Sequence, residues 1–221
     1  MLQKNVINEK TYTLLKRLMN DENLNGFNLV GGTSLALRIG HRQSEDLDLF
    51  TRNDFDTEKL KKHLFDNYEF SVKFQENNTL KGFIDDVLID CIKYDYDNLY
   101  DIDVIDGIRM LSIEDVIAMK LVAIYQNGTR LKDFIDIAYL SNIYTLNEMI
   151  EFCNKKTRCD NSFSIMKGLI YFDNVDYSEN VKVLDKDYSF DSIKKHLIKL
   201  CDNPDTLIKY NNLDISCIKK N

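Results

Sequence analysis

Two aspartates separated by a single residue, Asp46 and Asp48, lie in a segment where acidic and apolar residues alternate. In an extended strand, residues i and i+2 point to the same side. The two carboxylates would then share one face, while Leu47 and Leu49 point into the core. Neighbouring carboxylates repel each other and need a cation or a proton. Hard carboxylate oxygens suit Mg²⁺, which usually also binds substrate phosphates, so this spacing predicts a metal site.

Two glycines precede this strand and follow an apolar strand predicted over residues 27–30. Gly31 and Gly32 permit positive φ and allow a ligand to approach the backbone closely. They open a predicted helix that ends at Ile39, with Thr33 or Ser34 as its expected N-cap. The first N–H groups of a helix are free to face an anion. We therefore expect these four residues, 31–34, to cradle phosphates through their N–H groups and hydroxyls.

A phosphate cradle followed by a strand with paired aspartates is a layout for metal-assisted phosphoryl or nucleotidyl transfer. Each signal alone has an ordinary explanation, because Gly-Gly is often only a turn and Asp-x-Asp is often a solvated strand edge. The order strand, turn, helix and strand connects the two signals, and the combination favours chemistry.

Three motifs resemble the AbiEii/AbiGii toxin family of DNA polymerase beta-like nucleotidyltransferases: Gly-Gly-Thr-Ser-Leu-Ala-Leu-Arg, His-Arg-Gln-Ser and Asp-Leu-Asp-Leu-Phe. The resemblance covers roughly residues 26–140. It implies an α/β (α+β) fold, in which a mixed nucleotidyltransferase sheet flanked by helices is followed by an α-helical domain. It also implies transfer of NMP from NTP with Mg²⁺, by the toxin half of a bacterial toxin–antitoxin or abortive-infection system. An RNA acceptor is expected, with tRNA as the leading candidate.

Lys120 lies in the apolar stripe of a helix predicted to begin after Ser112 and to end near Gln126. A lysine in such a stripe must either extend to solvent or meet an anion. The segment Ala118-Met119-Lys120-Leu121 resembles the family's lysine region. That resemblance implies that Lys120 neutralises the charge of the triphosphate.

Asp133 and Asp136 are three residues apart near the start of the next predicted helix and share one face. Acidic residues in a first turn also serve as ordinary compensation of the helix dipole. The family shows a basic residue and two aspartates here, which implies that Asp133 orients or deprotonates the acceptor hydroxyl. Asp136 is then expected to support Lys132 or Arg130.

Three further residues are candidates for the site. Asp90 lies between apolar neighbours in a predicted strand, 87–94, and is either a solvated residue or a third metal ligand beside Asp46 and Asp48. Arg42 and Ser44 either contact phosphate or brace the turn, and the sequence leaves both alternatives open.

The remaining pattern divides the chain into an α/β domain, 1–106, and a helical domain, 107–221, which completes the cleft. An acidic, solvated connection over residues 94–107 marks the boundary. Further strands are predicted over 70–75 and 79–84, and further helices over 6–19, 55–68, 146–155, 162–172 and 190–200.

The composition fits a cytoplasmic enzyme of 221 residues with a net charge of −7. Such a charge argues against a general nucleic-acid-binding surface. Residues 1–119 hold 14 basic against 22 acidic residues, whereas residues 120–221 hold 15 against 14, which leaves room for a local basic patch. Five cysteines without metal spacing indicate reduced thiols. No apolar run approaches the length of a membrane span.

Other functions remain as alternatives. The acceptor of the same chemistry could be a protein or a small molecule, or the chain could be a non-catalytic binding module. Phosphatases of the haloacid dehalogenase type also carry Asp-x-Asp, but Phe50 stands where they usually have Thr or Val. The expected partners are an NTP, an RNA and an antitoxin encoded nearby, and a monomer is expected.

Overall fold

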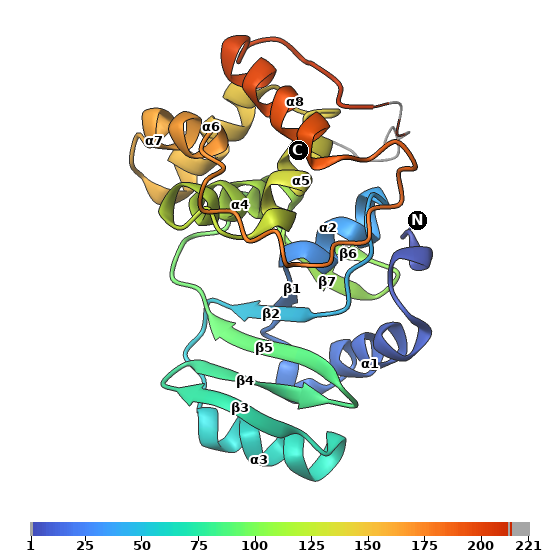
Figure 1. The fold of residues 1–221 in the computed structure, drawn as a ribbon. Helices are drawn as coiled ribbons and strands as arrows, with labels where there is room; N and C mark the ends of the chain where they lie inside the picture. Colours follow the sequence, from blue (N-terminus) through green and yellow to red (C-terminus); the bar gives the residue numbers. More distant parts are fainter. Residues whose placement is uncertain (1, 212, 214–221) are drawn as a thin grey trace.

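The computed structural model, which describes residues 2–211 and 213, contains a mixed sheet of seven strands (Figure 1). The strands are β1 (Asn28–Leu29), β2 (Leu47–Thr51), β3 (Ser71–Glu76), β4 (Thr79–Ile84), β5 (Val87–Lys93), β6 (Asp103–Ile105) and β7 (Ile108–Met110). Their order in the sheet is β3-β4-β5-β2-β1-β7-β6. β2 runs parallel to β5 and β1 runs parallel to β7, whereas the other pairs are antiparallel.

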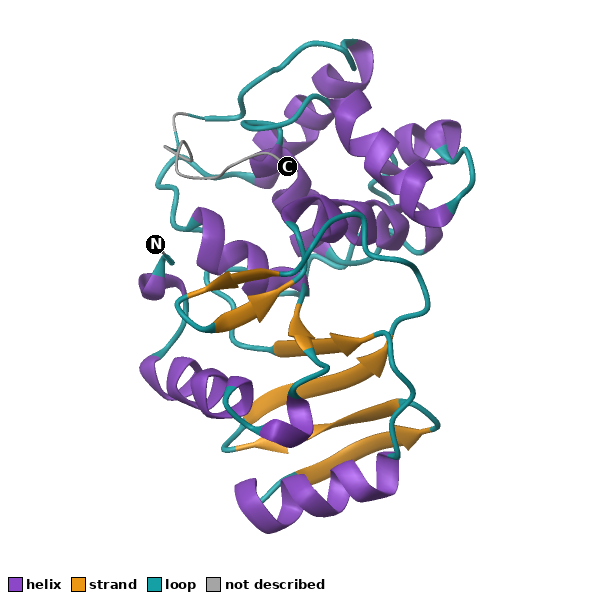
Figure 2. Ribbon diagram, turned by 180° about the vertical axis from the view of Figure 1, so that it is seen from behind, coloured by secondary structure: helices purple, strands orange, loops and turns teal. Residues whose placement is uncertain are grey.

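Eight α-helices accompany the sheet in the described part of the chain, and Figure 2 shows them in purple. They are α1 (Glu9–Met19), α2 (Gly31–Ile39), α3 (Thr57–Tyr68), α4 (Ile113–Gln126), α5 (Leu131–Leu140), α6 (Leu146–Thr157), α7 (Ser162–Leu169) and α8 (Phe190–Asp202). Helices α4 to α8 gather in one half of the molecule, and the sheet with α1 and α3 forms the other (Figure 1). This arrangement confirms the predicted fold class. None of the helices in the described residues is long and apolar enough to cross a membrane.

The two faces of the sheet have different surroundings. In β2, Leu47 and Leu49 are fully buried, while Asp48 and Phe50 are half-buried. The two leucines join a hydrophobic cluster with Leu80 of β4 and with residues of α1 and α3, as expected for alternating side chains on a half-covered sheet. We call this side the covered face. The side that bears Asp48 is the open face.

The helical half shares its core with the N-terminal part of the chain. Val30, Leu35 and Ile39 pack in one buried cluster with residues of α4, α5, α6, α7 and α8. The boundary predicted at residues 106 and 107 falls in the hairpin turn between β6 and β7, and β7 pairs with β1. The sheet therefore continues past that boundary.

A segment that we call the strap, residues 176–184, runs from the end of α7 towards α8 and passes along α2 (orange in Figure 1). At one end, the N–H of Asp176 donates to the carbonyl of Thr129 at 2.8 Å. At the other end, the strap pairs with residues 41–43, where the N–H of Gln43 donates to the carbonyl of Lys182 at 2.9 Å. The segment between α7 and α8 thus has a defined course.

Most predicted elements are present with boundaries shifted by a few residues, but three details differ. The first helix begins at Glu9 rather than at residue 6, because Asn8 caps it by accepting from the N–H of Thr11. The connection over residues 94–107, predicted to be solvated, contains β6, and β7 follows it; neither strand was predicted. The helix α2 begins at Gly31, and its N-cap is Val30, which offers no side-chain acceptor, so the predicted capping by Thr33 or Ser34 is wrong.

Candidate active site

Three acidic residues of the predicted metal site lie on or beside two adjacent strands. Asp48 of β2 is directly opposite Asp90 of β5 in the parallel register, so both side chains point to the open face. Asp46 immediately precedes β2 and is exposed. Its carbonyl accepts a hydrogen bond from Oγ1 of Thr33 at 2.5 Å. The N-terminal turn of α2 thereby fixes the backbone at the entry to β2.

The carboxyl group of Asp48 is poorly suited to carry a charge by itself. Burial raises its pKa, and the neighbouring charge of Asp90, with a smaller effect from Asp46, raises it further. Lys120 and Arg130 act in the opposite direction but leave the pKa above its usual value. A bound cation would remove this penalty, because it would stabilise the ionised form.

Asp90 has one oxygen available for such a cation. Its Oδ2 accepts a hydrogen bond from Nζ of Lys81 at 2.6 Å, whereas its Oδ1 is buried and has no partner among the described residues. An unsatisfied buried carboxylate oxygen is costly unless something binds it. The open oxygen beside Asp48 fits a hard divalent cation.

The carboxylates do not form a complete metal cage. In the described residues, no group of three or more His, Cys, Asp or Glu side chains is arranged to hold a metal ion. Mg²⁺ in phosphoryl-transfer enzymes is typically held by one or two carboxylates together with the phosphates of the substrate. The set Asp46, Asp48 and Asp90 therefore remains a prediction.

The glycine pair is required by contacts within the protein. Gly31 has φ +67°, and a Cβ added there would lie 2.1 Å from Oδ2 of Asp48. A Cβ added to Gly32 would lie 2.3 Å from Nη2 of Arg42. The turn thus brings the start of α2 against an acid of β2 and against a buried arginine.

The hydroxyl groups that follow the glycines are engaged inside the protein. Besides the carbonyl of Asp46, Oγ1 of Thr33 contacts Oγ of Ser44 at 2.8 Å. Oγ of Ser34 accepts from Nη1 of Arg38 at 2.8 Å. Because α2 lacks a side-chain cap, its first N–H groups are the part of the turn best suited to an anion.

A second set of charged side chains is buried, and its centre is Asp136 of α5. Arg42 forms two bonds to this residue, Nε to Oδ1 at 2.6 Å and Nη2 to Oδ2 at 2.9 Å. Nε2 of His41 lies 2.7 Å from Oδ1, and Nζ of Lys120 lies 2.8 Å from Oδ2. Nζ of Lys120 also donates to Oδ1 of Asp133 at 2.5 Å.

The charges of this cluster hold one another in the ionised state. Burial would raise the pKa of Asp136, but Arg42 and Lys120 hold it well below the usual value. Burial would also lower the pKa of Lys120, yet Asp133 and Asp136 keep it above the ordinary range. Burial lowers the pKa of His41 despite its bond to Asp136, so the ring is neutral. Lys120 is therefore a permanent cation within electrostatic reach of Asp48.

The predicted role of Asp136 as a support for Lys132 or Arg130 is wrong. Lys132 pairs with Glu179 of the strap at 2.8 Å, and Nε of Arg130 lies 3.7 Å from Oδ2 of Asp133. Asp136 faces inward because α5 is buried on nearly all sides. Its carboxylate meets the cations that enter the same interior.

Of the two alternatives for Arg42 and Ser44, the structure shows the bracing contacts. Arg42 is buried against Gly32 and bonded to Asp136, and Ser44 contacts Thr33. A contact of either side chain with phosphate remains a prediction.

A pocket of about 400 Å³ opens beside Asp46 and under the strap. Its lining is strongly polar: Arg42, Gln43, Ser44, Glu45, Asp46, Lys132, Glu179, Asn180, Val181 and Lys182. Both lysines come from the C-terminal half of the sequence, whereas the acids next to β2 come from the N-terminal half. The strap thus forms one wall of this pocket beside Asp46.

Sequence reasoning missed the strap and the central place of Asp136. A signal for the aspartate was present, because the residues around it, Phe134, Ile135, Ile137 and Ala138, are apolar at every helical angle. A helix that is apolar all round is buried, so an acid within it needs buried cations. No comparable pattern marked the strap.

Comparison with known proteins assigns the chain to a family. The family profile described as "Nucleotidyl transferase AbiEii toxin, Type IV TA system" matches residues 13–86 and 79–203. An uncharacterized protein of Aquifex aeolicus (strain VF5) is 32% identical over 155 residues, which is 67% of this chain and 75% of the relative. The family match shows a nucleotidyltransferase. The chain belongs to the AbiEii toxin family of nucleotidyltransferases.

Two solved structures from Helicobacter pylori share the fold. The crystal structure of JHP933 has a TM-score of 0.53 at 18% identity and covers 89% of this chain and 92% of its own. A protein described as a nucleotidyltransferase has a TM-score of 0.52, also at 18% identity, and covers 88% of this chain and 94% of its own. Both extend the likeness through the helical half.

Proposed function

We propose that this nucleotidyltransferase uses Mg²⁺ to transfer NMP from an NTP to the end of an RNA, with tRNA as the leading candidate. The observation that carries the proposal is the pairing of Asp48 with Asp90 on the open face, where Oδ1 of Asp90 has no partner among the described residues. Two crowded acids with a free oxygen, next to the buried cation Lys120, suit a reaction in which metal and triphosphate meet.

Each residue has a proposed part. Asp46, Asp48 and Asp90 hold Mg²⁺, which when bound aligns the attacking hydroxyl and offsets the charge of the leaving pyrophosphate. The N–H groups at the start of α2 receive the phosphates. Lys120 adds a positive charge that remains ionised at neutral pH.

Asp133 is proposed to orient or deprotonate the acceptor hydroxyl. Its Oδ1 binds Lys120 at 2.5 Å, and its Oδ2 lies 3.7 Å from Nε of the half-exposed Arg130. The carboxylate of Asp133 would thus accept the proton of the hydroxyl while lying between Lys120 and Arg130. The same contacts hold the carboxylate at one orientation.

The family description supports a toxin of a toxin–antitoxin system, and we propose a cognate antitoxin as partner. We also propose that the protein is cytoplasmic and monomeric. A protein or small molecule as acceptor is the rival within the same chemistry.

The first prediction is that Asp48→Asn abolishes nucleotide transfer and leaves the fold intact. The free energy of unfolding should stay the same or rise, because the variant removes one of two crowded acids. The protein is incubated with each labelled NTP, Mg²⁺ and total cellular RNA, and labelled RNA and labelled protein are separated. Asp66→Asn, an exposed acid on α3, is the matched control.

Label on tRNA-sized species that requires Asp48 supports the full proposal. Label on protein alone contradicts the RNA acceptor and leaves the nucleotidyltransferase in place. Near-native transfer by Asp48→Asn would show that the assignment of the metal site is wrong.

A further inference from the structure

The open face continues from Asp48 and Asp90 across β4 and β3, the two outermost strands at that edge of the sheet. The register places Asp90 opposite both Asp48 and Lys81. Lys81 in turn lies opposite Phe74 of β3. Directly opposed residues in neighbouring strands point to the same side of the sheet. A single row thus leads from the proposed metal site to Phe74, across three strand spacings or about 14 Å.

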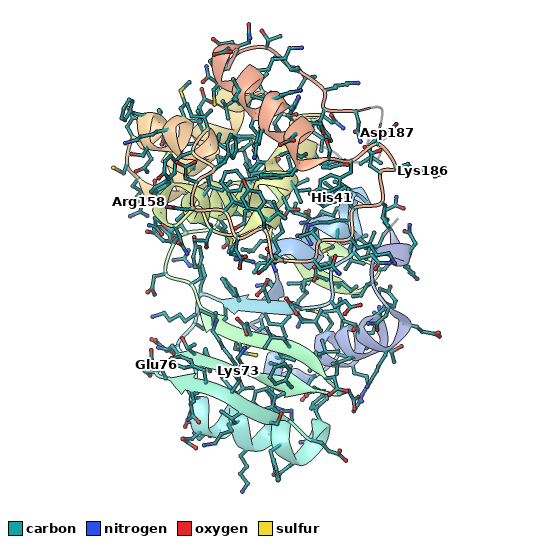
Figure 3. The ribbon with its side chains drawn as sticks, viewed as in Figure 1. His41, Lys73, Glu76, Arg158, Lys186 and Asp187 are labelled. Atoms are coloured by element: carbon teal, nitrogen blue, oxygen red, sulfur yellow. The ribbon has the colours of Figure 1, made fainter. Side chains whose placement is uncertain are left out.

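A second aromatic ring lies beside this row. Phe83 is two residues from Lys81 along β4 and therefore shares the open face. The register of β3 and β4 shifts between Val72 and Phe74, as at a β-bulge. Lys73 occupies this irregular position, and its Nζ lies 5.6 Å from the centroid of the Phe83 ring. Figure 3 labels Lys73 on this outer part of the sheet.

The two rings are open to solvent. The exposed fractions are 43% for Phe74 and 38% for Phe83, whereas Leu80, which points to the covered face between them, is fully buried. Lys73 lies over the Phe83 ring, and Lys81, which is opposite Phe74, holds its Nζ 2.6 Å from Oδ2 of Asp90. Exposed rings with adjacent cations are the components with which proteins bind single-stranded nucleic acid, because any base can stack on a ring and the cations contact the phosphates.

We propose that Lys73, Phe74, Lys81 and Phe83, which we call the aromatic platform, bind the single-stranded 3′ end of the RNA acceptor. This inference rests on the proposed function, since it requires an RNA acceptor. Bases stack on the two rings, the lysines contact backbone phosphates, and the row directs the terminal hydroxyl towards Asp48. The platform thus selects acceptors with an unpaired end.

The charge of the protein favours this kind of RNA over a long duplex. A net charge of −7 opposes binding that depends on many phosphate contacts. A few stacked bases need only a few cations. Continuity with the carboxylates favours RNA over a protein partner, because the row ends at the place where the acceptor must react.

The binding test uses the Asp48→Asn background, in which turnover cannot consume the probe. The probe is a fluorescent single-stranded oligoribonucleotide, and its affinity is measured by anisotropy. Phe74→Ala and Phe83→Ala should each weaken binding about tenfold or more, and Lys73→Ala should flatten its salt dependence. Phe65→Ala on α3, a ring that is 65% exposed, is the matched control and should bind as the parent does.

The kinetic test uses the active protein. The same platform variants should raise KM for RNA while kcat and KM for the NTP stay within about twofold of the wild type, because the platform contacts only the acceptor. Thermal melting of each variant confirms that the fold is intact. A duplex RNA with blunt ends should be a poor acceptor for the wild type.

The outcomes separate the inference from the proposed function. Unchanged RNA affinity in Phe74→Ala and Phe83→Ala overturns the platform, and RNA labelling by the wild type would then uphold the proposed function alone. A change in self-association or in partner-protein binding, with RNA affinity unchanged, also overturns it. Loss of RNA affinity specific to the platform variants, in a protein that labels no acceptor, supports the platform and contradicts the proposed reaction.

Discussion

Asp136 shows how a single carboxylate determines the geometry of the candidate site. It binds Arg42, His41 and Lys120, and it does so from a fully buried position. Removing one partner of a buried ion pair leaves an uncompensated charge. Lys120, which bonds to Asp136, also acts on the pKa of Asp48, so Lys120 connects Asp136 to the candidate metal site.

We expect Asp136→Asn to lower the free energy of unfolding by about 3–5 kcal/mol, because Arg42 and Lys120 lose their shared anion. Urea denaturation of the purified variant measures this loss. Asp66→Asn, at an exposed position, should change stability by no more than about 0.5 kcal/mol. A loss as small as that of the control would mean that the buried cations find other partners.

Lys120 and Asp133 should show strong coupling. Among the described residues, Lys120→Met leaves Asp133 with Arg130 at 3.7 Å as its remaining ion pair, so both activity and stability should fall, the stability by about 3 kcal/mol. Adding Asp133→Asn removes the unpaired charge and should restore about 1–3 kcal/mol of that stability, but not the activity. A double-mutant cycle with urea melts measures the coupling, and strictly additive effects would argue against the pairing.

The buried histidines predict a loss of stability in mild acid. Burial lowers the pKa of His41, and it lowers that of His196 to about 4. In the unfolded chain both rings titrate near 6.5. Below that pH the unfolded state therefore binds protons that the folded state does not, and the free energy of unfolding falls.

Urea melts at pH 7.5, 6.5 and 5.0 measure this dependence. We expect His41→Asn to reduce the slope below pH 6.5, because one of the two titrating rings is gone. Equal slopes in the variant and the wild type would show that His41 is protonated in the folded protein.

At the scale of elements, the turn that opens α2 places a backbone with positive φ directly against Asp48 of the candidate site. Gly31 and Gly40 begin and end the helix with φ +67° and +71°. A side chain at Gly31 would collide with Oδ2 of Asp48, whereas one at Gly40 would meet only the flexible side chain of Gln3 at 3.0 Å. The two glycines thus offer a comparison at equal backbone strain.

Gly31→Ala and Gly40→Ala should each cost about 1–2 kcal/mol of stability, since both put a side chain at positive φ. Only Gly31→Ala should also lower kcat, by about a hundredfold, because the added side chain displaces the carboxylate of Asp48 by about 1 Å. Nucleotide incorporation and thermal melts on the same samples separate the effects. Equal activity in both variants would show that the turn at Gly31 does not affect the candidate site.

The same turn shows which features could be predicted from the sequence and which could not. Local patterns predicted β2 and α2, because side-chain periodicity and glycine are local properties, whereas the register that sets Asp48 opposite Asp90 joins two strands that are distant in the sequence. The contacts of Gly32 with Arg42 and of Asp136 with His41 and Arg42 join residues about 10 and about 95 positions apart. A long-range partner leaves no periodic trace in a single sequence, so these contacts required the structure.

At the scale of the molecule, the two predicted domains share a hydrophobic cluster and the buried ion cluster. We therefore expect a single cooperative unfolding transition. Far-UV circular dichroism and tyrosine fluorescence, followed in the same urea titration, should give coincident curves. Two separated transitions would support independent units divided near residue 106.

The strap also has a consequence for the order in which the protein is made. The strand β2, which carries Asp48, leaves the ribosome early, but Gln43 just before it pairs with Lys182, which is translated about 140 residues later. At about 5–20 residues per second, that interval is about 7 to 28 seconds. A nascent chain would hold its acids long before the wall beside them, so the enzyme of this toxin family stays incomplete until most of the chain has been synthesised.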